Sequence, residues 1–236
     1  MGRSLGQSSI IFKDSVVLDL EKEFPREFTT VGLSMSGGVE STALLLLLIQ
    51  VYGKENVHVF TGFISGRRQW ESENTFKLAQ EAGLSPHQIH VVDRKYEVMS
   101  PKESYDLMIQ AKKIVSLDGW FNGINRLLFA QTRTKSAEEI KRINKLGIFL
   151  PFIRLYKQHT IEIFFLLDQV DLLYKTFSCT VQKHVHCGNC YCCWERVRGF
   201  ATIDQKDHAI YGKTWREMLD VCYYSDLLIV DPKEET

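Results

Sequence analysis

Two adjacent glycines, Gly37 and Gly38, constrain the fold of this chain more than any other feature. They are preceded by an apolar strand candidate, Val31–Met35, and followed by an apolar helix candidate, Ser41–Tyr52, which ends at Gly53. Adjacent glycines let backbone N–H groups turn toward an anion because no Cβ is in the way, and the N-terminus of the following helix adds its positive dipole end. The segment therefore predicts a strand, a phosphate-binding turn and a helix.

The alternation of strand and helix continues along the chain. Further strands are expected over Val57–Ile64, His87–Asp93 and Ile148–Ile153, and further helices over Trp70–Ala82, from the capping box at Ser100 to Val115, and from the capping box at Ser136 to Gly147. Such alternation is typical of an α/β fold, a parallel sheet with helices on both faces. In these sheets ligands bind at the carboxyl ends of the strands.

Three regions are predicted. Residues 1–30 form a peripheral element in which Ile10–Phe12 and Val16–Leu20 pair as a hairpin. Residues 31–175 form the α/β domain. Residues 176–236 form a C-terminal helical and loop module, with short helices around Trp194–Ala201 and Trp215–Val221.

Five of the six cysteines lie between residues 179 and 193. A tight cluster in a long chain indicates a metal site, because a disulfide scaffold spreads its cysteines along a small secreted chain. Four thiolates suit a closed, structural Zn²⁺ site, and the expected ligands are Cys179, Cys187, Cys190 and Cys193. Three alternatives stay open: Cys192 as a ligand, His184 or His186 in place of one cysteine, and an iron–sulfur cluster.

Charge and hydropathy narrow the function classes. Lys plus Arg and Asp plus Glu each total 29, so the net charge is zero and the chain lacks the charge excess of a non-specific nucleic-acid binder. The N-terminal residues carry no apolar signal region, and the longest apolar run, Ala43–Ile49, is too short to cross a membrane. A cytoplasmic protein without a membrane partner is expected.

The glycine turn reads S-G-G-x-E-S, which resembles the S-G-G-x-D-S loop of the PP-loop ATP pyrophosphatases. A Walker loop is excluded because Gly38 stands where its Lys belongs. The resemblance implies an adenine nucleotide alpha hydrolase-like fold that uses ATP and Mg²⁺. It also implies ATP binding by Ser34, Ser36, Gly37, Gly38, Val39, Glu40, Ser41 and Thr42. Glu40 replaces the family's Asp, and its extra methylene moves the carboxylate by roughly 1.5 Å.

The C-terminal region resembles the QueC family of 7-cyano-7-deazaguanine synthases. The matching stretches are Thr176-Phe-Ser-Cys179, then His186 to Cys193, then Arg196-x-x-Gly-Phe200. The family adenylates 7-carboxy-7-deazaguanine, adds ammonia to give the amide, and dehydrates the amide to a nitrile. The resemblance implies catalytic roles for Ser36, Glu40, Ser41 and Lys157, ATP binding by Arg67, substrate binding by Gly123, Asn125 and Arg126, and a homodimer.

Three departures from the family pattern favour other products: Glu40, Ile124, and residues 131–147, which are longer and more basic than in the family. Ile124 stands where the family has an Arg, so a fork-shaped donor for the substrate is missing. A second hypothesis is therefore a QueC-like ligase that stops at the amide, or joins the deazaguanine to another amine on a protein or nucleic acid, in nucleic-acid modification or antiphage defence.

A third hypothesis is a non-catalytic, zinc-stabilised nucleic-acid-binding module. Its phosphate contacts would come from basic side chains near the cysteines and its base stacking from two aromatic ones; these are Lys183, His184, His186, Arg196 and Arg198, with Tyr191 and Trp194. The opposing interpretation is that the arginines brace the cysteine loop.

Overall fold

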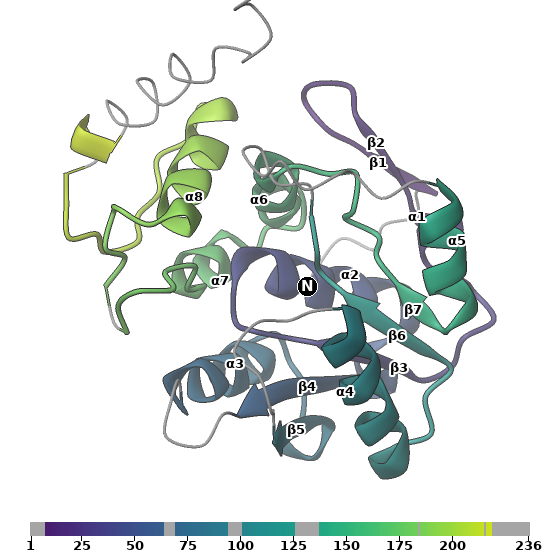
Figure 1. Cartoon of the computed structure of the whole chain (residues 1–236). Coiled ribbons are helices and arrows are strands. Elements are labelled where there is room, and N and C mark those ends of the chain that lie inside the picture. The colour runs from purple at the N-terminus through teal and green to yellow at the C-terminus, as the bar shows by residue number, and fades with distance from the viewer. Residues whose placement is uncertain are drawn as a thin grey trace, which may run out of the picture.

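The structure, a computed structural model, describes residues 8–63, 69–93, 101–125, 137–183, 185–214 and 216–218. Its centre is a five-stranded sheet in the order β5-β4-β3-β6-β7, in which every pairing is parallel. The strands are β3 (Val31–Ser34), β4 (Val57–Phe63), β5 (Ile89–Asp93), β6 (Gly119–Asn122) and β7 (Ile148–Phe149). The predicted parallel α/β sheet is confirmed (Figure 1).

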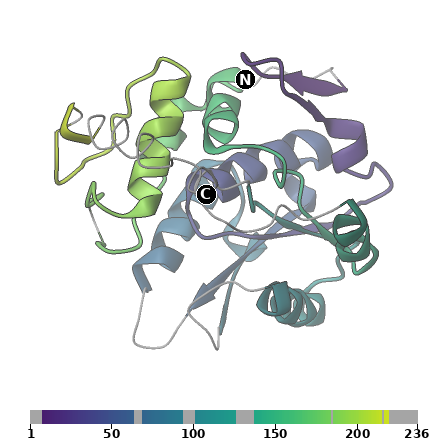
Figure 2. The same cartoon turned by 45° about the horizontal axis from the view of Figure 1, so that its top comes forward.

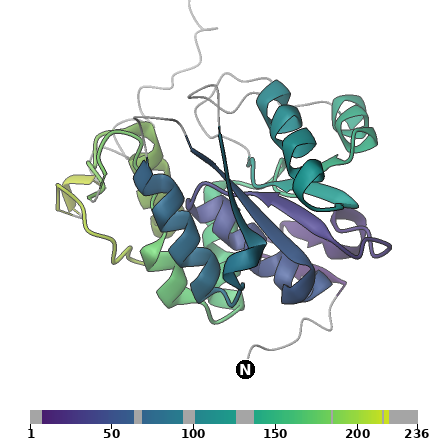
Figure 3. The ribbon, with the colours of Figure 1, turned by 90° about the horizontal axis from the view of Figure 1, so that it is seen from below.

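Helices cover both faces of the sheet (Figure 3). On one face, α2 (Val39–Tyr52) packs against β3 and β4, and α3 (Gln69–Glu81) packs against β4 and β5. On the other face lie α4 (Pro101–Ile114), which contacts β3, and α5 (Ala137–Lys145), which contacts β7. All four helices fall where the alternating sequence pattern predicts them.

A second layer of helices lies outside α2. It consists of α6 (Lys157–Leu166), α7 (Val170–Lys175) and α8 (Tyr191–Thr202), and α6 packs between α2 and α8 (Figure 2). This placement explains the composition of α2: Leu44–Leu48 are all buried because the helix has the sheet on one side and α6 on the other. Among the described residues, no helix is long and apolar enough to cross a bilayer.

The N-terminal residues form the predicted hairpin. Strands β1 (Ser9–Ile11) and β2 (Val17–Asp19) pair antiparallel and lead into α1 (Leu20–Glu23). At the tip of the hairpin, the Lys13 N–H donates to Glu162 Oε1 on α6 at 2.9 Å, and Lys13 Nζ donates to the carbonyl oxygen of Ile203 at 3.1 Å. The hairpin thus contacts the middle of α6 and the C-terminal end of α8.

Several elements differ from the sequence-based expectation. Strand β6 is not predicted by the sequence pattern, because it has only four residues and begins with a glycine. Strand β7 ends at Phe149, shorter than expected, and Pro151, which has no N–H for a sheet ladder, stands two residues beyond. Residues Pro86–Gln88 form a 3₁₀ turn before β5, and a second such turn, Lys54–Asn56, precedes β4. The helix expected over Trp215–Val221 lies largely outside the described residues.

The strand order places a topological switch point at the first strand of the sheet. The chain runs from β3 outward through β4 to β5, then returns to β6 on the other side of β3. In open α/β sheets the crevice at such a point, beyond the carboxyl ends of the two strands, is where ligands bind. Here that crevice lies after Ser34 and Asn122.

Candidate functional site: a phosphate loop beside a four-cysteine cluster

The phosphate loop, residues Ser36–Ser41, joins the carboxyl end of β3 to α2. Gly37 has φ +74°, a left-handed conformation that favours glycine, and Gly38 is the N-cap of α2. The Thr42 N–H and hydroxyl both donate to the Gly38 carbonyl oxygen, at 3.1 and 2.8 Å. The 14-residue helix α2 therefore begins directly at the turn and directs its N-terminal N–H groups toward the crevice.

The loop side chains divide into two groups. The Ser36 side chain is exposed, whereas Ser34, Val39 and Thr42 are buried. The Ser41 hydroxyl accepts from the Ser36 N–H and donates to the Gly38 carbonyl oxygen, both at 3.3 Å. Ser41 and Thr42 thus hold the shape of the turn, and Ser36 is the hydroxyl that faces outward.

Helix α3 lies against the loop at Gly37. A Cβ at Gly37 would come within 3.1 Å of Asn74 Nδ2 and 3.2 Å of Thr75 Oγ1. Both of these atoms are buried, and among the described residues neither has a hydrogen-bond partner. Buried polar atoms without partners are costly in a folded protein, so unused polar capacity here fits a site that binds a polar ligand. The residues of the loop thus suit a phosphate group.

Lys157 and Glu40 meet beside the loop. Lys157 begins α6 and Glu40 lies in the first turn of α2, and their side chains form an ion pair. Glu195 of α8 joins them, with Oε2 at 3.4 Å from Lys157 Nζ. Burial alone would lower the pKa of Lys157, but the carboxylates of Glu40 and Glu195 outweigh it, so the pKa is raised and the ammonium stays charged.

The expected substrate residues are only partly described. Gly123 packs against the first turn of α2, where a Cβ would lie 3.0 Å from the carbonyl carbon of Glu40 and from Ser41 N. Asn125 is buried, and its Nδ2 has no partner among the described residues. Ile124 between them is 36% exposed. Arg67 and Arg126 lie outside the described residues, as do His184 and Cys222.

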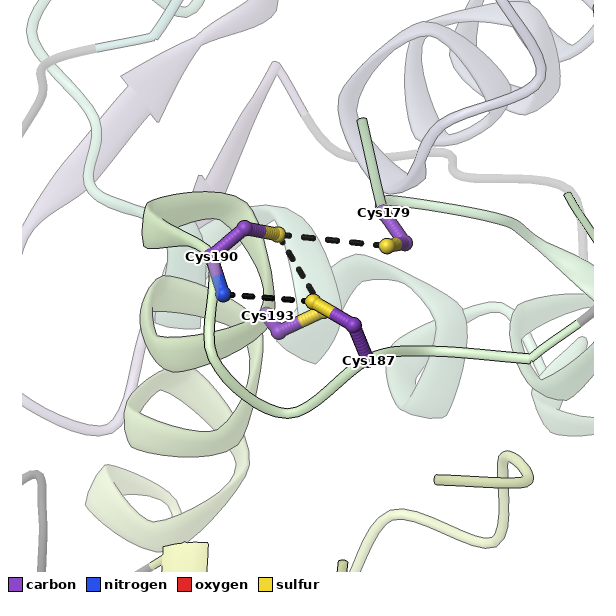
Figure 4. A group of neighbouring side chains, drawn as sticks. All are labelled: Cys179, Cys187, Cys190 and Cys193. Carbon is purple, nitrogen blue, oxygen red and sulfur yellow. Dashed lines mark hydrogen bonds between the residues drawn. The ribbon is translucent and has the colours of Figure 1, made fainter. Parts of the chain in front are cut away.

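The four predicted metal ligands come together. The sulfur atoms of Cys179, Cys187, Cys190 and Cys193 all lie within 4.8 Å of one another (Figure 4). The sulfur of Cys190 lies 3.4 Å from that of Cys193 and 3.9 Å from that of Cys179. The sulfurs of Cys187 and Cys193 are 4.0 Å apart. A tetrahedral Zn²⁺ with Zn–S bonds of about 2.3 Å requires sulfurs about 3.8 Å apart, so the cluster has the dimensions of a zinc site.

Backbone groups around the cluster favour thiolates. Val181 N and Gln182 N point at Cys179 Sγ at 3.4 and 3.3 Å, and Asn189 N and Cys190 N point at Cys187 Sγ at the same two distances. N–H groups directed at sulfur stabilise its charged form, the form that binds metal. Gly188, with φ +69°, supplies the turn between the ligands.

The two alternative ligands in the described residues do not join the cluster. Cys192 is not among the clustered sulfurs, and its thiol lies instead in the field of Lys157; burial raises its pKa to about 11. His186 is buried, and its Nε2 accepts from the Ser178 N–H at 3.1 Å. Burial lowers the pKa of His186 to about 4, so it is a neutral core histidine.

Arg196 braces the fold and does not present a basic surface. Its side chain is fully buried, with Nε at 2.6 Å from Asp207 Oδ2 and Nη1 at 2.6 Å from Thr176 Oγ1. Nη2 donates to the Leu173 carbonyl oxygen at 3.2 Å. The third hypothesis, in which Arg196 and His186 contact nucleic-acid phosphates, is contradicted at these two buried residues, and the opposing interpretation holds for Arg196. Trp194, whose Nε1 donates to the Gly188 carbonyl oxygen at 3.0 Å, is half-buried rather than free for stacking.

A cavity of about 290 Å³ adjoins the loop on the side of the cysteines. Its wall includes Asn74 and Phe177, both of which contact Gly37, and three lysines, Lys77, Lys175 and Lys183. The wall also includes Glu73, and Lys175 pairs with Glu81, so the lining carries both signs of charge.

A comparison with known protein families finds a match in the C-terminal half of the chain. Residues 125–204 match the sequence model of the family described as "Queuosine biosynthesis protein QueC". In this stretch the chain is similar to the QueC family. The matched stretch contains Lys157, the four clustered cysteines and Arg196, and it covers about a third of the chain. No curated protein sequence matches the chain.

Solved structures of similar shape include two NAD synthetases. The glutamine-dependent NAD+ synthetase from Acinetobacter baumannii, in complex with ADP, is 14% identical at a TM-score of 0.41; the match covers 61% of this chain and 30% of that protein. The NH3-dependent NAD synthetase from Campylobacter jejuni subsp. jejuni NCTC 11168, in complex with nitrate, is 15% identical at a TM-score of 0.44, covering 66% and 71%. These distant likenesses carry no functional conclusion.

Sequence reasoning misses Glu195. It lies between the signature positions Cys193 and Arg196, and it belongs to no motif. Its contact with Lys157 also cannot be predicted from the sequence, because that contact depends on α6 and α8 packing side by side. The sequence offers one weak signal, an acidic residue in a helix whose other charged residues are the arginines Arg196 and Arg198.

Proposed function

We propose that this chain is an ATP-dependent ligase that adenylates the carboxylate of a 7-carboxy-7-deazaguanine-type acid and joins the activated acid to ammonia. The observation that carries the proposal is the position of the phosphate loop at the β3–β6 switch point, with QueC-like residues beside it. A carboxylate is a poor electrophile, since its oxygen cannot leave. Adenylation supplies a leaving group, and the QueC match supports chemistry of this class.

The phosphate loop, Lys157 and Glu40 would each act on the phosphates of ATP. The loop N–H groups after Gly37 and the α2 N-terminus would hold the pyrophosphate that departs, and the Ser36 hydroxyl would donate to it. Lys157 would neutralise charge that develops on the phosphates, because its ammonium is held at the edge of the loop. Glu40 would hold a Mg²⁺ ion, which when bound would supply positive charge to the phosphates.

The cysteine cluster would hold Zn²⁺ in a structural role. Four thiolates fill a tetrahedral shell and leave no open position for a substrate. The metal would therefore fix the start of α8 and the turn at Gly188.

A second candidate keeps the same activation step but changes the product. Ile124 offers an apolar side chain where the family's guanidinium would read the substrate, and it is exposed, unlike its described neighbours Gly123 and Asn125. An enzyme of this kind would stop at the amide, or transfer the activated acid to an amine on a protein or nucleic acid.

Purified protein tests both candidates in one assay with ATP, Mg²⁺, ammonium and 7-carboxy-7-deazaguanine. Release of AMP and pyrophosphate is expected from the wild type and a large loss from Ser36→Ala. The mass of the product then separates nitrile from amide or conjugate. If the wild type releases no AMP with this acid, the proposed substrate is wrong.

A further inference from the structure

Three charged side chains from three helices form a buried triad beside the phosphate loop. Lys157 opens α6, Glu40 lies in the first turn of α2, and Glu195 lies in the middle of α8. The Lys157 and Glu195 side chains are 4% and 3% exposed, whereas that of Glu40 is 20% exposed. The triad therefore has one end at the loop and the other inside the cysteine module (residues 176–236).

The composition of the triad exceeds what the fold requires. One carboxylate is enough to neutralise one buried ammonium, and Glu40 already pairs with Lys157. Glu195 adds a second buried carboxylate, whose desolvation opposes folding unless it is well bonded. Its Oε2 lies 3.4 Å from Lys157 Nζ, and its Oε1 accepts from the Tyr191 hydroxyl at 3.3 Å. A group retained at such a cost calls for a role beyond packing.

Helix α8 also fixes the stem of Lys157. Gly199 lies one turn after Glu195, and a Cβ there would come within 3.0 Å of Lys157 Cγ and 2.7 Å of Ile161 Cδ1. The missing side chain lets α8 approach α6 closely enough for Glu195 to reach the ammonium. Helix α8, which carries Cys193, therefore contacts both the ammonium group and the aliphatic part of the Lys157 side chain.

We infer that Glu195 is a positioning residue: it holds the Lys157 ammonium at the edge of the phosphate loop and so couples the cysteine module to ATP chemistry. This inference rests on the proposed function. Without the Glu195 carboxylate, Glu40 is the one ion-pair partner that the described residues leave to Lys157, and the lysine is free to follow that more exposed side chain. Misplacement of a group that acts on the phosphates lowers the rate of reaction.

The test compares Glu195→Gln with Glu162→Gln. Glu162 is also buried, but it lies on α6 and accepts from the Lys13 N–H. In Glu195→Gln, kcat for AMP release is expected to fall about 10-fold or more, while KM for ATP, zinc content and melting temperature stay near those of the control. Glu195→Asp, which keeps the charge, should recover part of the rate.

Two outcomes overturn the inference. One is a wild-type kcat in Glu195→Gln; the other is a loss of zinc and stability in parallel with activity, which marks a structural role.

A readout without turnover separates this inference from the proposed function. The ¹⁵N NMR signal of the Lys157 ammonium, assigned with Lys157→Arg, should exchange with water faster in Glu195→Gln than in Glu162→Gln. If the wild type releases no AMP, the proposed function fails, and the NMR comparison still decides the role of Glu195: an equal exchange rate in both variants overturns it.

Discussion

The Phe177 N–H donates to the carbonyl oxygen of Gly37 at 2.9 Å. This bond joins the phosphate loop to the segment that enters the cysteine cluster, across 140 residues of sequence. The next residues on that segment are Ser178, whose N–H donates to His186, and Cys179, the first of the clustered cysteines. The turn at Gly37 and the cysteine cluster are therefore parts of one structural unit, and changes in either should be felt at the loop.

The first prediction concerns the conformation of Gly37. In Gly37→Ala, the new Cβ would meet Asn74 and Thr75 of α3 at 3.1–3.2 Å, and alanine disfavours a φ of +74°. The loop should shift, and the rate of ATP cleavage should fall by about 100-fold, the effect of misplacing a reacting group by about 1 Å.

Gly83→Ala is the matched control. Gly83 has φ +99°, but a Cβ added there would meet nothing within 4 Å, and the residue follows the C-terminus of α3, away from the loop. This variant should lose about 1 kcal/mol of stability and keep its activity. Equal rates of ATP cleavage in the two variants would contradict a role for the Gly37 turn.

The second prediction concerns the metal. The protein should contain about one zinc ion per chain, and Cys190→Ser should lose the metal together with its cooperative unfolding transition, because the ligands converge only in the folded state. Elemental analysis and thermal unfolding measure both. Cys192→Ser is the control, since Cys192 lies outside the clustered sulfurs, and it should keep its zinc. Zinc loss in Cys192→Ser alone would reassign the ligands.

Much of the scaffold could be predicted from the sequence. The positions of β3, α2, β4 and α3 follow from local periodicity and from the glycines that end each helix, and both kinds of signal are local. Strand β6 escapes prediction because its four residues owe their conformation to pairing with β3 and β7. A strand specified by its neighbours leaves little periodicity to read.

The site likewise has residues that could be predicted from the sequence and residues that could not. The phosphate loop and the cysteine ligands are short motifs, so their residues could be predicted. The partners of Lys157 could not, because Glu40, Lys157 and Glu195 are brought together by the packing of three helices. For Arg196 the sequence left two roles open, a surface contact and a brace for the cysteine loop, and the fold uses it as a buried anchor.

The third prediction concerns that anchor. Asp207 forms a fully buried ion pair with Arg196, and it also accepts from the Tyr211 hydroxyl at 2.5 Å. Asp207→Asn leaves the guanidinium without its counter-charge, so the free energy of unfolding should fall by about 3–5 kcal/mol. Urea unfolding measures the loss, and Lys183→Met, a change at an exposed side chain, should be neutral.

The same pair predicts a pH dependence. Burial alone would raise the pKa of Asp207, but Arg196 outweighs it and lowers the pKa below the ordinary value of 3.8. The unfolded chain therefore binds this proton more readily, so the stabilisation is complete above about pH 4 and is lost as the pH falls through the lower pKa of the folded state. Asp207→Asn should lack this part of the acid transition; an unchanged transition would show that other carboxylates dominate it.

The fourth prediction concerns the close approach of Gly123 to α2. A Cβ at this position would lie 3.0 Å from the Glu40 carbonyl carbon and the Ser41 N, and 3.1 Å from the Glu40 carbonyl oxygen. These are backbone atoms that cannot rotate away, so Gly123→Ala should push the first turn of α2 aside. Overpacking of this kind costs about 1–3 kcal/mol of stability. Because the displaced turn carries Glu40, the rate of ATP cleavage should also fall about 10-fold or more.

Gly212→Ala is the control, because the nearest neighbours of its added Cβ would be at 3.6 and 3.8 Å, ordinary contact distances. Steady-state rates and melting temperatures of the two variants test the prediction, and a Gly123→Ala enzyme with a normal rate would mean that the β6 turn does not fix the phosphate loop.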